Sequence, residues 1–328
     1  MKKSMIANMI AAALVVCAIG TGCKGANSTG AKAAGEEQRS VVETPVFDGD
    51  SAYAYVKAQC DFGPRVPNTA AHKQCGDYLV ATLQCFGAEV IEQKAPVTTF
   101  DGTRLEMRNI IGQWNGKSEQ RVVLLAHWDS RPWADADSDP ANHKKPVMGA
   151  NDGASGVGVL LELARVLAAN QPMVGIDIVL VDAEDWGDSG DDDSWALGAQ
   201  YWAAHPHRAG YKPIFGILLD MVGAADAQFT YEYYSQQHAP QVNKEVWAAA
   251  NAAGFGSYFV ARQGGAITDD HVAVNNAGIP CIDIIDMRQQ SAHGFFDGWH
   301  TTHDTMENIS APTLKAVGQT IVNYLWQF

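Results

Sequence analysis

Carboxylates and histidines recur along this chain after short apolar runs, in a pattern typical of metal-dependent chemistry. In order, they are His127, Asp129, Asp152, Glu184, Asp185, Asp220, Asp269, Asp270, His271 and His300. We expect each to stand where a predicted strand stops, because ligands of open α/β sheets bind outside the carboxyl ends of the strands. Carboxylate oxygens and imidazole nitrogens are ligands for zinc and similar divalent metals. The sequence therefore predicts a metalloenzyme of the zinc-hydrolase type.

Asp152 lies in the run GANDGASG, just before a predicted helix. Its flanking glycines allow close approach of the backbone, so the turn would present the carboxylate. An isolated Asn-Asp-Gly run would more simply be a helix N-cap. The other candidate ligands along the chain favour a metal ligand here.

Glu184 and Asp185 directly follow the apolar run IVLVDA. Neighbouring residues point in different directions, so one carboxylate can bind a metal while the other faces the substrate. A carboxylate pair beside a cation divides naturally into a ligand and a general base. For Asp185 alone, a solvated acidic loop is the competing interpretation.

His300 lies in GWHTTHDT, close to the aromatic residues Phe295 and Trp299. A lone histidine is more often structural than a ligand, but a histidine among aromatic side chains is typical of a small-molecule pocket. His303 is the competing ligand in this segment.

The composition limits the classes of partner. The chain has 328 residues, 47% of them hydrophobic, and a net charge of −14. Without a basic stripe to neutralise phosphates, nucleic acid is excluded as an expected partner. The acidic balance fits solubility together with an acidic metal site. The loop GDSGDDDSWALG lacks the alternation of an EF-hand, so we interpret it as solvated rather than calcium-binding.

The first residues have the character of an export signal. Met1 to Lys3 form a basic start, and the apolar run after them is too short for a confident membrane span. Gly22-Cys23 resembles a bacterial lipoprotein cleavage site, with ordinary secretory cleavage as the alternative. We therefore predict a signal peptide over 1–22, a flexible tether over 23–40 and a single catalytic domain over 41–328. The predicted location is the periplasm, with a lipid anchor through Cys23 as one possibility.

Predicted strands and helices alternate along the remainder of the chain. Strands are expected at 89–93, 98–99, 105–114, 121–126, 176–181, 214–219 and 281–285, and helices at 51–59, 70–86, 154–169, 248–253 and 312–326. This alternation predicts an α/β fold, a three-layer α/β/α sandwich with a mixed, mostly parallel central sheet. Asp101-Gly102 predicts a hairpin turn, which places antiparallel strands at one edge.

Four cysteines, Cys60, Cys75, Cys85 and Cys281, fall in the predicted catalytic domain. Export permits disulfides, and four cysteines allow three pairings among which the sequence does not decide. Cys75 and Cys85 are expected on one helix, too far apart for a bridge. The simplest expectation is buried free thiols.

These motifs together resemble one family. The ordered set HWDS, NDGASGVG, the acidic pair after a buried strand, LLDMVGA, DDH and WHTTHDT is similar to the M28-type zinc aminopeptidases. Within that fold it looks most like the glutaminyl-peptide cyclotransferases, in particular their bacterial forms. The resemblance extends from about Tyr53 to the C-terminus.

The resemblance implies roles for the metal-site residues. The single zinc ion of glutaminyl cyclases would be held by Asp152, Asp185 and His300, and Glu184 would be the general acid and base. Animal cyclases have Glu-Glu where this chain has Glu184-Asp185, and aspartate remains a sound zinc ligand.

The resemblance also implies roles around the metal. Asp220 and Asp270 would belong to a hydrogen-bonded network beside the substrate, and Trp299 and Phe295 would line its pocket. His127 corresponds to a ligand of the second zinc ion in dizinc peptidases, and to a residue behind the metal in cyclases. We expect Asp129, like His127, to lie behind the metal ligands.

Three hypotheses follow. The favoured one is a zinc-dependent acyltransferase, binding one Zn²⁺ per chain, that cyclises the N-terminal glutamine of peptides and proteins to pyroglutamate. The second is a dizinc aminopeptidase in which His127 and Asp220 bind another metal ion. The third is an inactive binding module, which the intact acidic and histidine positions disfavour. A monomer is expected.

Overall fold

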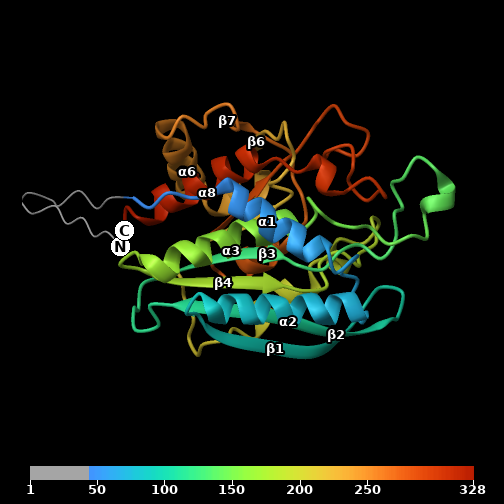
Figure 1. The fold of residues 1–328 in the computed structure, drawn as a ribbon, viewed down its shortest axis with the longest axis horizontal. Helices are drawn as coiled ribbons and strands as arrows, with labels where there is room; N and C mark the ends of the chain where they lie inside the picture. The colour runs from blue at the N-terminus through green and yellow to red at the C-terminus, as the bar shows by residue number, and fades with distance from the viewer. Residues whose placement is uncertain (1–43) are drawn as a thin grey trace, which may run out of the picture. The chain divides into compact units, whose positions relative to one another are not determined.

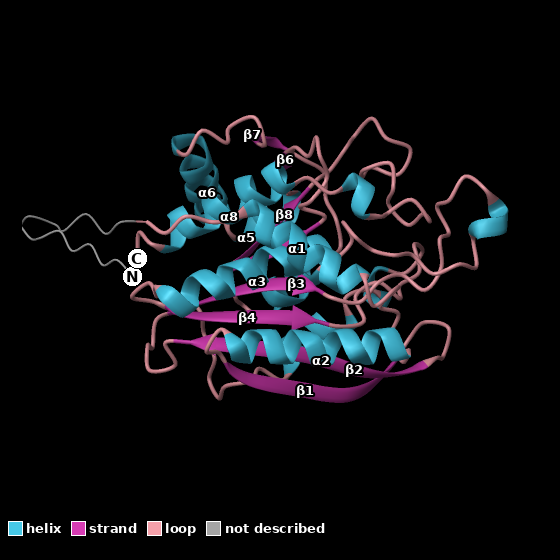
Figure 2. Cartoon of the chain, viewed as in Figure 1, coloured by secondary structure: helices cyan, strands magenta, loops and turns pink. Residues whose placement is uncertain are grey.

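The computed structural model describes residues 44–328, through which a six-stranded sheet runs (Figures 1 and 2). In spatial order its strands are β1 (Glu89–Thr98), β2 (Arg104–Trp114), β4 (Gly175–Val181), β3 (Arg121–His127), β5 (Phe215–Asp220) and β8 (Cys281–Ile285). The neighbours β4, β3, β5 and β8 pair in parallel, whereas β1 and β2 join them by antiparallel pairing. The predicted mixed, mostly parallel sheet with an antiparallel edge is confirmed.

Helices cover both faces of the sheet. One face packs against α1 (Gly49–Cys60), α2 (Ala70–Cys85), α3 (Ala154–Ala169) and α8 (Ala311–Leu325), and the other against α4 (Leu197–Ala204) and α7 (Asp270–Asn276). Alternate residues of β3 show the two layers: Leu124 joins the first core, and Val123 and Leu125 join the second. Buried parallel strands are apolar on both faces for this reason. The three-layer prediction is therefore confirmed.

A smaller group of elements lies beside β8. It contains α5 (Tyr233–His238), α6 (Pro240–Ala252) and a two-stranded sheet of β6 (Phe229–Tyr231) and β7 (Phe259–Gln263). Contacts of β6 and α5 with β8, and of α6 with α8, attach this group to the main sandwich. Tyr234 of α5 lines the pocket described below.

Helix α3 lies very close to β5 because of a glycine. A Cβ atom at Gly156 would overlap the carbonyl oxygen of Leu219, and one at Gly158 would overlap Val56 of α1. Glycine is the residue that permits such close approach. The start of α3 is therefore held against the carboxyl end of β5, which brings Asp152 beside Asp220.

The structure departs from the sequence prediction at one edge. Residues 89–98 form the single strand β1, where two short strands were predicted. Pro96 does not interrupt it because β1 is an edge strand, where a missing N–H costs no ladder hydrogen bond. The short elements α4, α5, α7, β6 and β7 were not predicted. Of α6, only the C-terminal part, within the predicted helix 248–253, was predicted.

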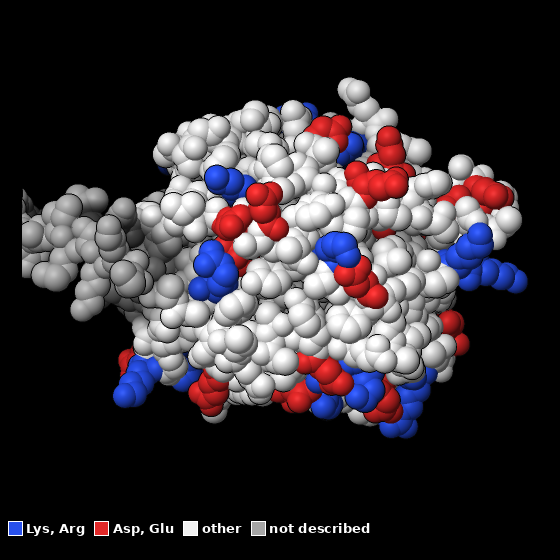
Figure 3. Space-filling view, in the orientation of Figure 1, with Lys and Arg blue, Asp and Glu red and all other residues white. Residues whose placement is uncertain are grey.

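The described residues, 44–328, form one compact unit. The predicted signal peptide, the tether and Cys23 lie outside the described residues. Within 44–328, no helix combines the length and apolarity needed to cross a membrane. On the face drawn in Figure 3, Lys and Arg lie next to Asp and Glu, without a continuous basic stripe.

The four cysteines of the described region are free thiols. Cys75 and Cys85 share α2, as predicted. Cys60, Cys75 and Cys281 are buried, but Cys85 is exposed, so the expectation of a buried thiol was wrong there. Cys85 is the last residue of α2, where the helix end faces solvent.

Candidate active site

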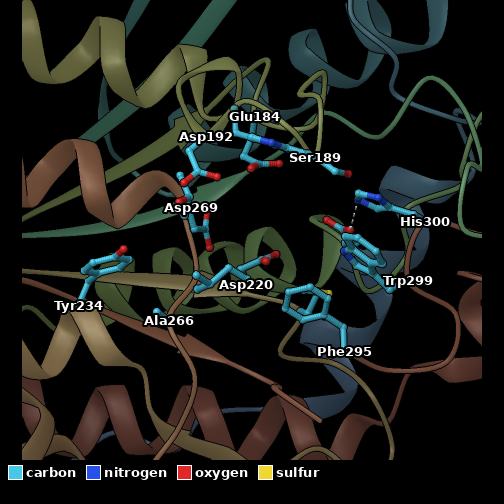
Figure 4. A pocket seen from close by; sticks show the side chains of 15 residues that line it. Glu184, Ser189, Asp192, Asp220, Tyr234, Ala266, Asp269, Phe295, Trp299 and His300 are labelled. Atoms are coloured by element: carbon cyan, nitrogen blue, oxygen red, sulfur yellow. Dashed lines mark ion pairs between the residues drawn. The ribbon is translucent and has the colours of Figure 1, made fainter. Parts of the chain in front are cut away.

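A pocket of about 370 Å³ opens beyond the carboxyl ends of β4 and β5. Seven residues singled out from the sequence line it, namely Asp152, Glu184, Asp220, Asp269, Phe295, Trp299 and His300. Figure 4 shows the acids Glu184, Asp220 and Asp269 across the pocket from His300, Trp299 and Phe295. The predicted position of the site outside the strand ends agrees with the structure.

The side chains of Asp152, Asp185 and His300 converge at one side of this pocket. Each offers one ligand atom, and these atoms lie within 4.8 Å of one another. His300 Nε2 is 3.1 Å from Asp185 Oδ1 and 3.6 Å from Asp152 Oδ2. Two carboxylates and one imidazole, all buried, form a donor set suited to zinc with an open position for substrate. His303, the competing ligand, is exposed and belongs to none of the clusters found in 44–328.

A second group of possible ligands shares Asp152. His127 Nε2 lies 3.0 Å from Asp152 Oδ1 and 3.2 Å from Asp220 Oδ1. Burial opposes the charged imidazolium, but the neighbouring carboxylates of Asp129, Asp152 and Asp220 raise the pKa of His127 well above its usual value. The two groups share Asp152, and together their residues would suit two metal ions. If no second metal ion is bound, protonated His127 can pair with the same two carboxylates, Asp152 and Asp220.

The backbone adopts uncommon conformations at and beside the site residues. Ala183, just before the acidic pair, and His300 both have left-handed backbone, with φ of 56° and 52°. A Cβ atom at Gly153 would overlap the imidazole of His127, so only glycine fits after Asp152. Such backbone conformations cluster at functional sites, where the surrounding structure holds them.

The expectation that every candidate follows a strand was wrong in part. His127 and Asp220 end β3 and β5, and Glu184-Asp185 follow β4. Asp152 instead precedes α3, Asp269 caps α7, and His300 lies in a loop. Turns before helices and long loops also reach the carboxyl end of a parallel sheet, and apolar runs do not reveal them.

Buried side chains behind the ligands fix their backbone. Asp129 accepts hydrogen bonds from the N–H groups of Glu184 and Asp185, both at 3.2 Å. Asp304 does the same for Asn151 at 2.8 Å and Asp152 at 3.1 Å. Burial, reinforced by the charge of Asp152, raises the pKa of Asp304 to about 8. Asp129 was placed behind the metal from the sequence; Asp304 was not singled out, although it lies in the quoted run WHTTHDT.

Arg131 was also missed. Its guanidinium donates to the backbone carbonyl of Asp185 at 3.2 Å and forms two hydrogen bonds with Asp135, at 2.6 and 2.7 Å. Asp135 in turn lies 3.7 Å from Nδ1 of His300. Partners of this kind set the orientation of a ligating histidine. Arg131 follows HWDS in the sequence, but spacing alone does not show which way its long side chain turns.

Glu184 is a buried pocket carboxylate, 8% exposed. Burial first, then the charges of Asp185, Asp269 and Asp270, raises its pKa well above the usual value, while His127 opposes the shift. A carboxylate that readily takes a proton is suited to general-base catalysis near neutral pH. Glu184 is not among the convergent ligand atoms, so it is available for that role.

Asp220 and Asp269 lie beside Glu184. Burial, followed by the charges of Asp152 and Asp269, raises the pKa of Asp220 to about 7, although its hydrogen bond with His127 lowers it. The sequence assigned the second network position to Asp270, but the structure places Asp269 on the pocket wall. Asp270 is fully buried behind it. The geometry therefore favours Asp269 for that position.

Aromatic rings form the opposite wall. Trp299 stacks on the imidazole of His300 with centroids 3.6 Å apart, and Phe295 packs on Trp299 at 4.9 Å. Trp195, which the sequence did not single out, lies parallel to His300 at 5.9 Å. Its ring is covered on one side by the Arg131 guanidinium, 4.9 Å away. The pocket thus combines an acidic wall with an aromatic one.

Comparison with known proteins is consistent with this geometry. Peptidase family M28 matches residues 109–325, so the chain belongs to that family of zinc-dependent proteins. In crystal structures, the glutaminyl cyclase of Bacteroides thetaiotaomicron is 51% identical, with a TM-score of 0.85 over 87% of this chain and all of that one. The Porphyromonas gingivalis glutaminyl cyclase is 53% identical, with a TM-score of 0.85 over 86% and 99% of the two chains.

More distant relatives divide between two activities. Aminopeptidase YwaD of Bacillus subtilis is 28% identical over 80% of this chain, which spans only 54% of that protein. A glutaminyl-peptide cyclotransferase-like protein of Bos taurus is 24% identical over 80% of this chain and 72% of its own length. The predicted likeness to M28 proteins, and within them to bacterial glutaminyl cyclases, is confirmed.

Proposed function

We propose that this protein is a glutaminyl-peptide cyclotransferase. It converts the N-terminal glutamine of peptides and proteins to pyroglutamate and releases ammonia. The observation that carries the proposal is the identity of 51–53% with glutaminyl cyclases that the chain covers almost completely. The pocket supports it, because the buried carboxylate Glu184 lines it together with the zinc-type ligands Asp152 and His300, and faces the aromatic wall.

Asp152, Asp185 and His300 would hold one zinc ion. Bound there, zinc supplies a Lewis acid that polarises the γ-carboxamide carbonyl of the substrate. Asp129 and Arg131 hold the backbone of Asp185, and Asp304 holds that of Asp152, through the hydrogen bonds described above. Asp135 lies beside the imidazole of His300. One ion per chain is our proposal, and the group around His127 is the alternative second position.

Glu184 would move the proton. The α-amino nitrogen attacks the γ-carboxamide carbon, and Glu184 accepts the proton that this nitrogen loses. The bond between that carbon and its own nitrogen then breaks, and Glu184 returns the proton to the departing ammonia. Glu184 alone therefore carries the proton from the attacking amine to the departing ammonia. Its raised pKa makes both halves of this exchange feasible.

The aromatic wall would fold the substrate. The reaction joins two ends of one residue, so the pocket's task is to hold the glutamine side chain curled with its amine near its carboxamide. Trp299 and Phe295 offer flat apolar surface to the methylene groups. Asp220 and Asp269 face them, where they can accept hydrogen bonds from the amine.

The dizinc aminopeptidase remains the second candidate, because the observation that favours it is specific. His127 and Asp220 are positioned around Asp152 as ligands of a second metal ion would be. An aminopeptidase would use Glu184 to activate water and would release the first residue of a peptide.

Mass spectrometry of two peptides distinguishes these functions. We expect purified protein loaded with zinc to remove one ammonia from a Gln-initiated peptide and to leave a Leu-initiated peptide intact. Release of the first residue from either peptide would mean that the protein is an aminopeptidase and not a cyclase. No change in either peptide with zinc bound would favour the binding module.

We further propose that the protein is exported to the periplasm and can be anchored through Cys23. The support is the basic and apolar character of residues 1–22 and the Gly22-Cys23 pair. Labelling with a radioactive fatty acid should mark the wild-type protein and not Cys23→Ala. Equal labelling of both would exclude this anchor.

A further inference from the structure

The end of the molecule opposite the candidate active site carries exposed apolar side chains. The strands β3, β4, β5 and β8 are parallel, so their amino ends lie together at the edge of the sheet away from the pocket. Met173, two residues before β4, is 84% exposed, and Ile214, directly before β5, is 42% exposed. Phe328 is 40% exposed and packs on Phe215, the first residue of β5, with ring centroids 5.6 Å apart. Exposed apolar side chains that gather at one end indicate an interaction surface.

A basic pocket of about 400 Å³ lies at the same end. The charged side chains that line it are Lys117, Glu119, Arg121, Arg208 and Lys212. The charge of Arg121 is balanced by Asp177, whose carboxylate lies 2.6 Å from the guanidinium. Three further cations therefore accompany one acid here, on a chain whose net charge is −14. The local charge is suited to an anionic partner.

Hydrogen bonds connect the basic pocket to the apolar side chains. Nη2 of Arg208 donates to the carbonyl of Gly116 at 2.9 Å, next to Lys117. In the same turn, the side chain of Asn115 donates to the carbonyl of Met173 at 3.0 Å. The cations and the apolar side chains therefore belong to one surface.

The described chain also begins at this end. Its first residues lie beside α8, where the side chain of Gln319 donates to the carbonyl of Pro45 at 3.0 Å. Val46, the next residue, is 73% exposed. Figure 1 shows the blue start of the described chain and the marked C-terminus at the same end, and the β4 arrow points away from both. An anchor at Cys23, as proposed above, would join the described unit here.

We propose that this end of the molecule docks on a membrane surface that contains anionic phospholipids. The cations of the basic pocket bind lipid phosphates, and Met173, Ile214 and Phe328 enter the interface between headgroups and acyl chains. Lysine and arginine beside exposed apolar side chains are the combination that binds such a surface. Docked in this way, the candidate active site faces away from the membrane, where soluble peptides and proteins can reach it.

Vesicle sedimentation tests the docking without the anchor. The chain from residue 24 onward lacks Cys23 and keeps the whole compact unit 44–328. We expect it to sediment with vesicles of phosphatidylethanolamine and phosphatidylglycerol, and to stay in solution with vesicles of phosphatidylcholine. Binding should weaken in about 1 M salt, because the attraction between the cations and the lipid phosphates is screened.

Two variants separate charge from apolar contact. Lys117→Gln combined with Lys212→Gln should lower the partition coefficient about tenfold, because two cations near the anionic surface are lost. Met173→Ser should lower it about fivefold, because the thioether side chain no longer leaves water. Both changes are at exposed positions, so the urea midpoint of each variant should match wild type.

Matched controls carry the same chemical changes at the active-site end. Lys144→Gln combined with Lys145→Gln alters the loop after β3, and Phe100→Ser alters the turn before β2. Phe100 is 47% exposed, comparable to the apolar side chains of the proposed surface. These controls should partition like wild type.

Several results would overturn the inference. Absence of sedimentation, or equal sedimentation with both kinds of vesicle, would exclude docking on anionic lipid. Equal losses in the variants and their controls would mean that no particular surface docks. Inorganic phosphate that binds in calorimetry, without vesicle binding, would make the basic pocket a site for a soluble anion. A dimer in ultracentrifugation that Met173→Ser dissociates would mean that a second copy of the chain covers this end.

Turnover on vesicles tests the orientation, and this arm alone rests on the proposed function. Vesicle-bound protein should release ammonia from a Gln-initiated peptide at the rate of free protein, because its pocket faces away from the lipid. A loss of rate on binding would overturn the orientation. Protein that releases no ammonia in either state would reject the proposed function, and the sedimentation result would still decide whether this end docks.

Discussion

Strand β4 connects two groups of buried carboxylates with opposite character. Near its amino end, Asp177 accepts two hydrogen bonds from Arg121, at 2.6 and 2.7 Å, one from the Tyr211 hydroxyl at 2.6 Å and one from Gln113 at 3.0 Å. Although burial opposes it, His207, which lies 3.8 Å away, and these partners hold the pKa of Asp177 well below its usual value. Beyond its carboxyl end, Glu184 is as deeply enclosed, but its pKa is raised.

The difference shows what each end of the sheet does. Asp177 has its charge balanced by the protein, so it contributes to stability. Glu184, Asp220 and Asp269 face a pocket and have no arginine partner among the described residues; only Asp220 is paired, with His127. They are available to bind a cation, a proton or a substrate amine. Buried carboxylates that line a cleft and have strongly shifted pKa values are typical of a functional site.

The largest effect is expected at Glu184. Glu184→Gln should lower kcat by about 10² to 10⁴, because the proton acceptor and donor is removed while shape is kept. Zinc content should stay the same, since Glu184 is not a ligand. The rate of ammonia release and the metal content of the purified variant test this, with the exposed Glu106→Gln as control. Turnover at the wild-type rate would exclude Glu184 from the reaction.

At the opposite end of β4, substitution of Asp177 should lower stability and leave activity unchanged. Asp177→Asn leaves the Arg121 guanidinium buried without its anion, which should cost about 3 kcal/mol in the free energy of unfolding. Its kcat and KM should match wild type at a temperature where both are folded. Urea denaturation gives the first quantity and peptide turnover the second. A loss of kcat without loss of stability would contradict the division between the two ends.

The contribution of Asp177 should also depend on pH. Because its folded pKa is lower than its unfolded value of about 4, its stabilisation is complete above that value and is lost as pH falls toward the folded pKa. The stability gap between wild type and Asp177→Asn should therefore be constant from pH 7 to about 5 and narrow below it. Urea titrations at several pH values measure the gap. A difference in stability that widened as the pH fell would mean that folding raises the pKa of Asp177 instead of lowering it.

A smaller effect is expected at the aromatic wall. Trp299→Leu removes the ring that stacks on His300 and should raise KM about tenfold, with a lesser change in kcat. Zinc should remain bound, because all three ligands are retained. Kinetics with a Gln-initiated peptide and metal analysis check both points, and Phe295→Leu serves for comparison. Loss of zinc from Trp299→Leu would mean that the ring supports the metal rather than the substrate.

The sequence predicted the parts of this molecule that have a local signature. The apolar runs gave β8 and α3 with the bounds of the structure, and the acidic pair after β4 stood out at once. The candidate ligands Asp152, Asp185 and His300 converge in space, although they are far apart in the chain.

Other features have no local signature. Which of Asp269 and Asp270 reaches the pocket depends on the direction in which α7 starts, because adjacent side chains diverge. Arg131 and Asp304 act through backbone groups more than 50 residues away, and only the folded chain brings these together. The short elements α4 and α5 contain too few turns for an apolar period to appear.

Zinc titration with two substrates tests the central claim most directly. Zinc is added stepwise to metal-free protein while ammonia release from a Gln-initiated peptide and leucine release from a Leu-initiated peptide are followed. We predict that ammonia release rises in proportion to zinc and saturates at about one ion per chain, with no leucine released. Leucine release that appears as a second ion binds would contradict the account and establish a dizinc aminopeptidase.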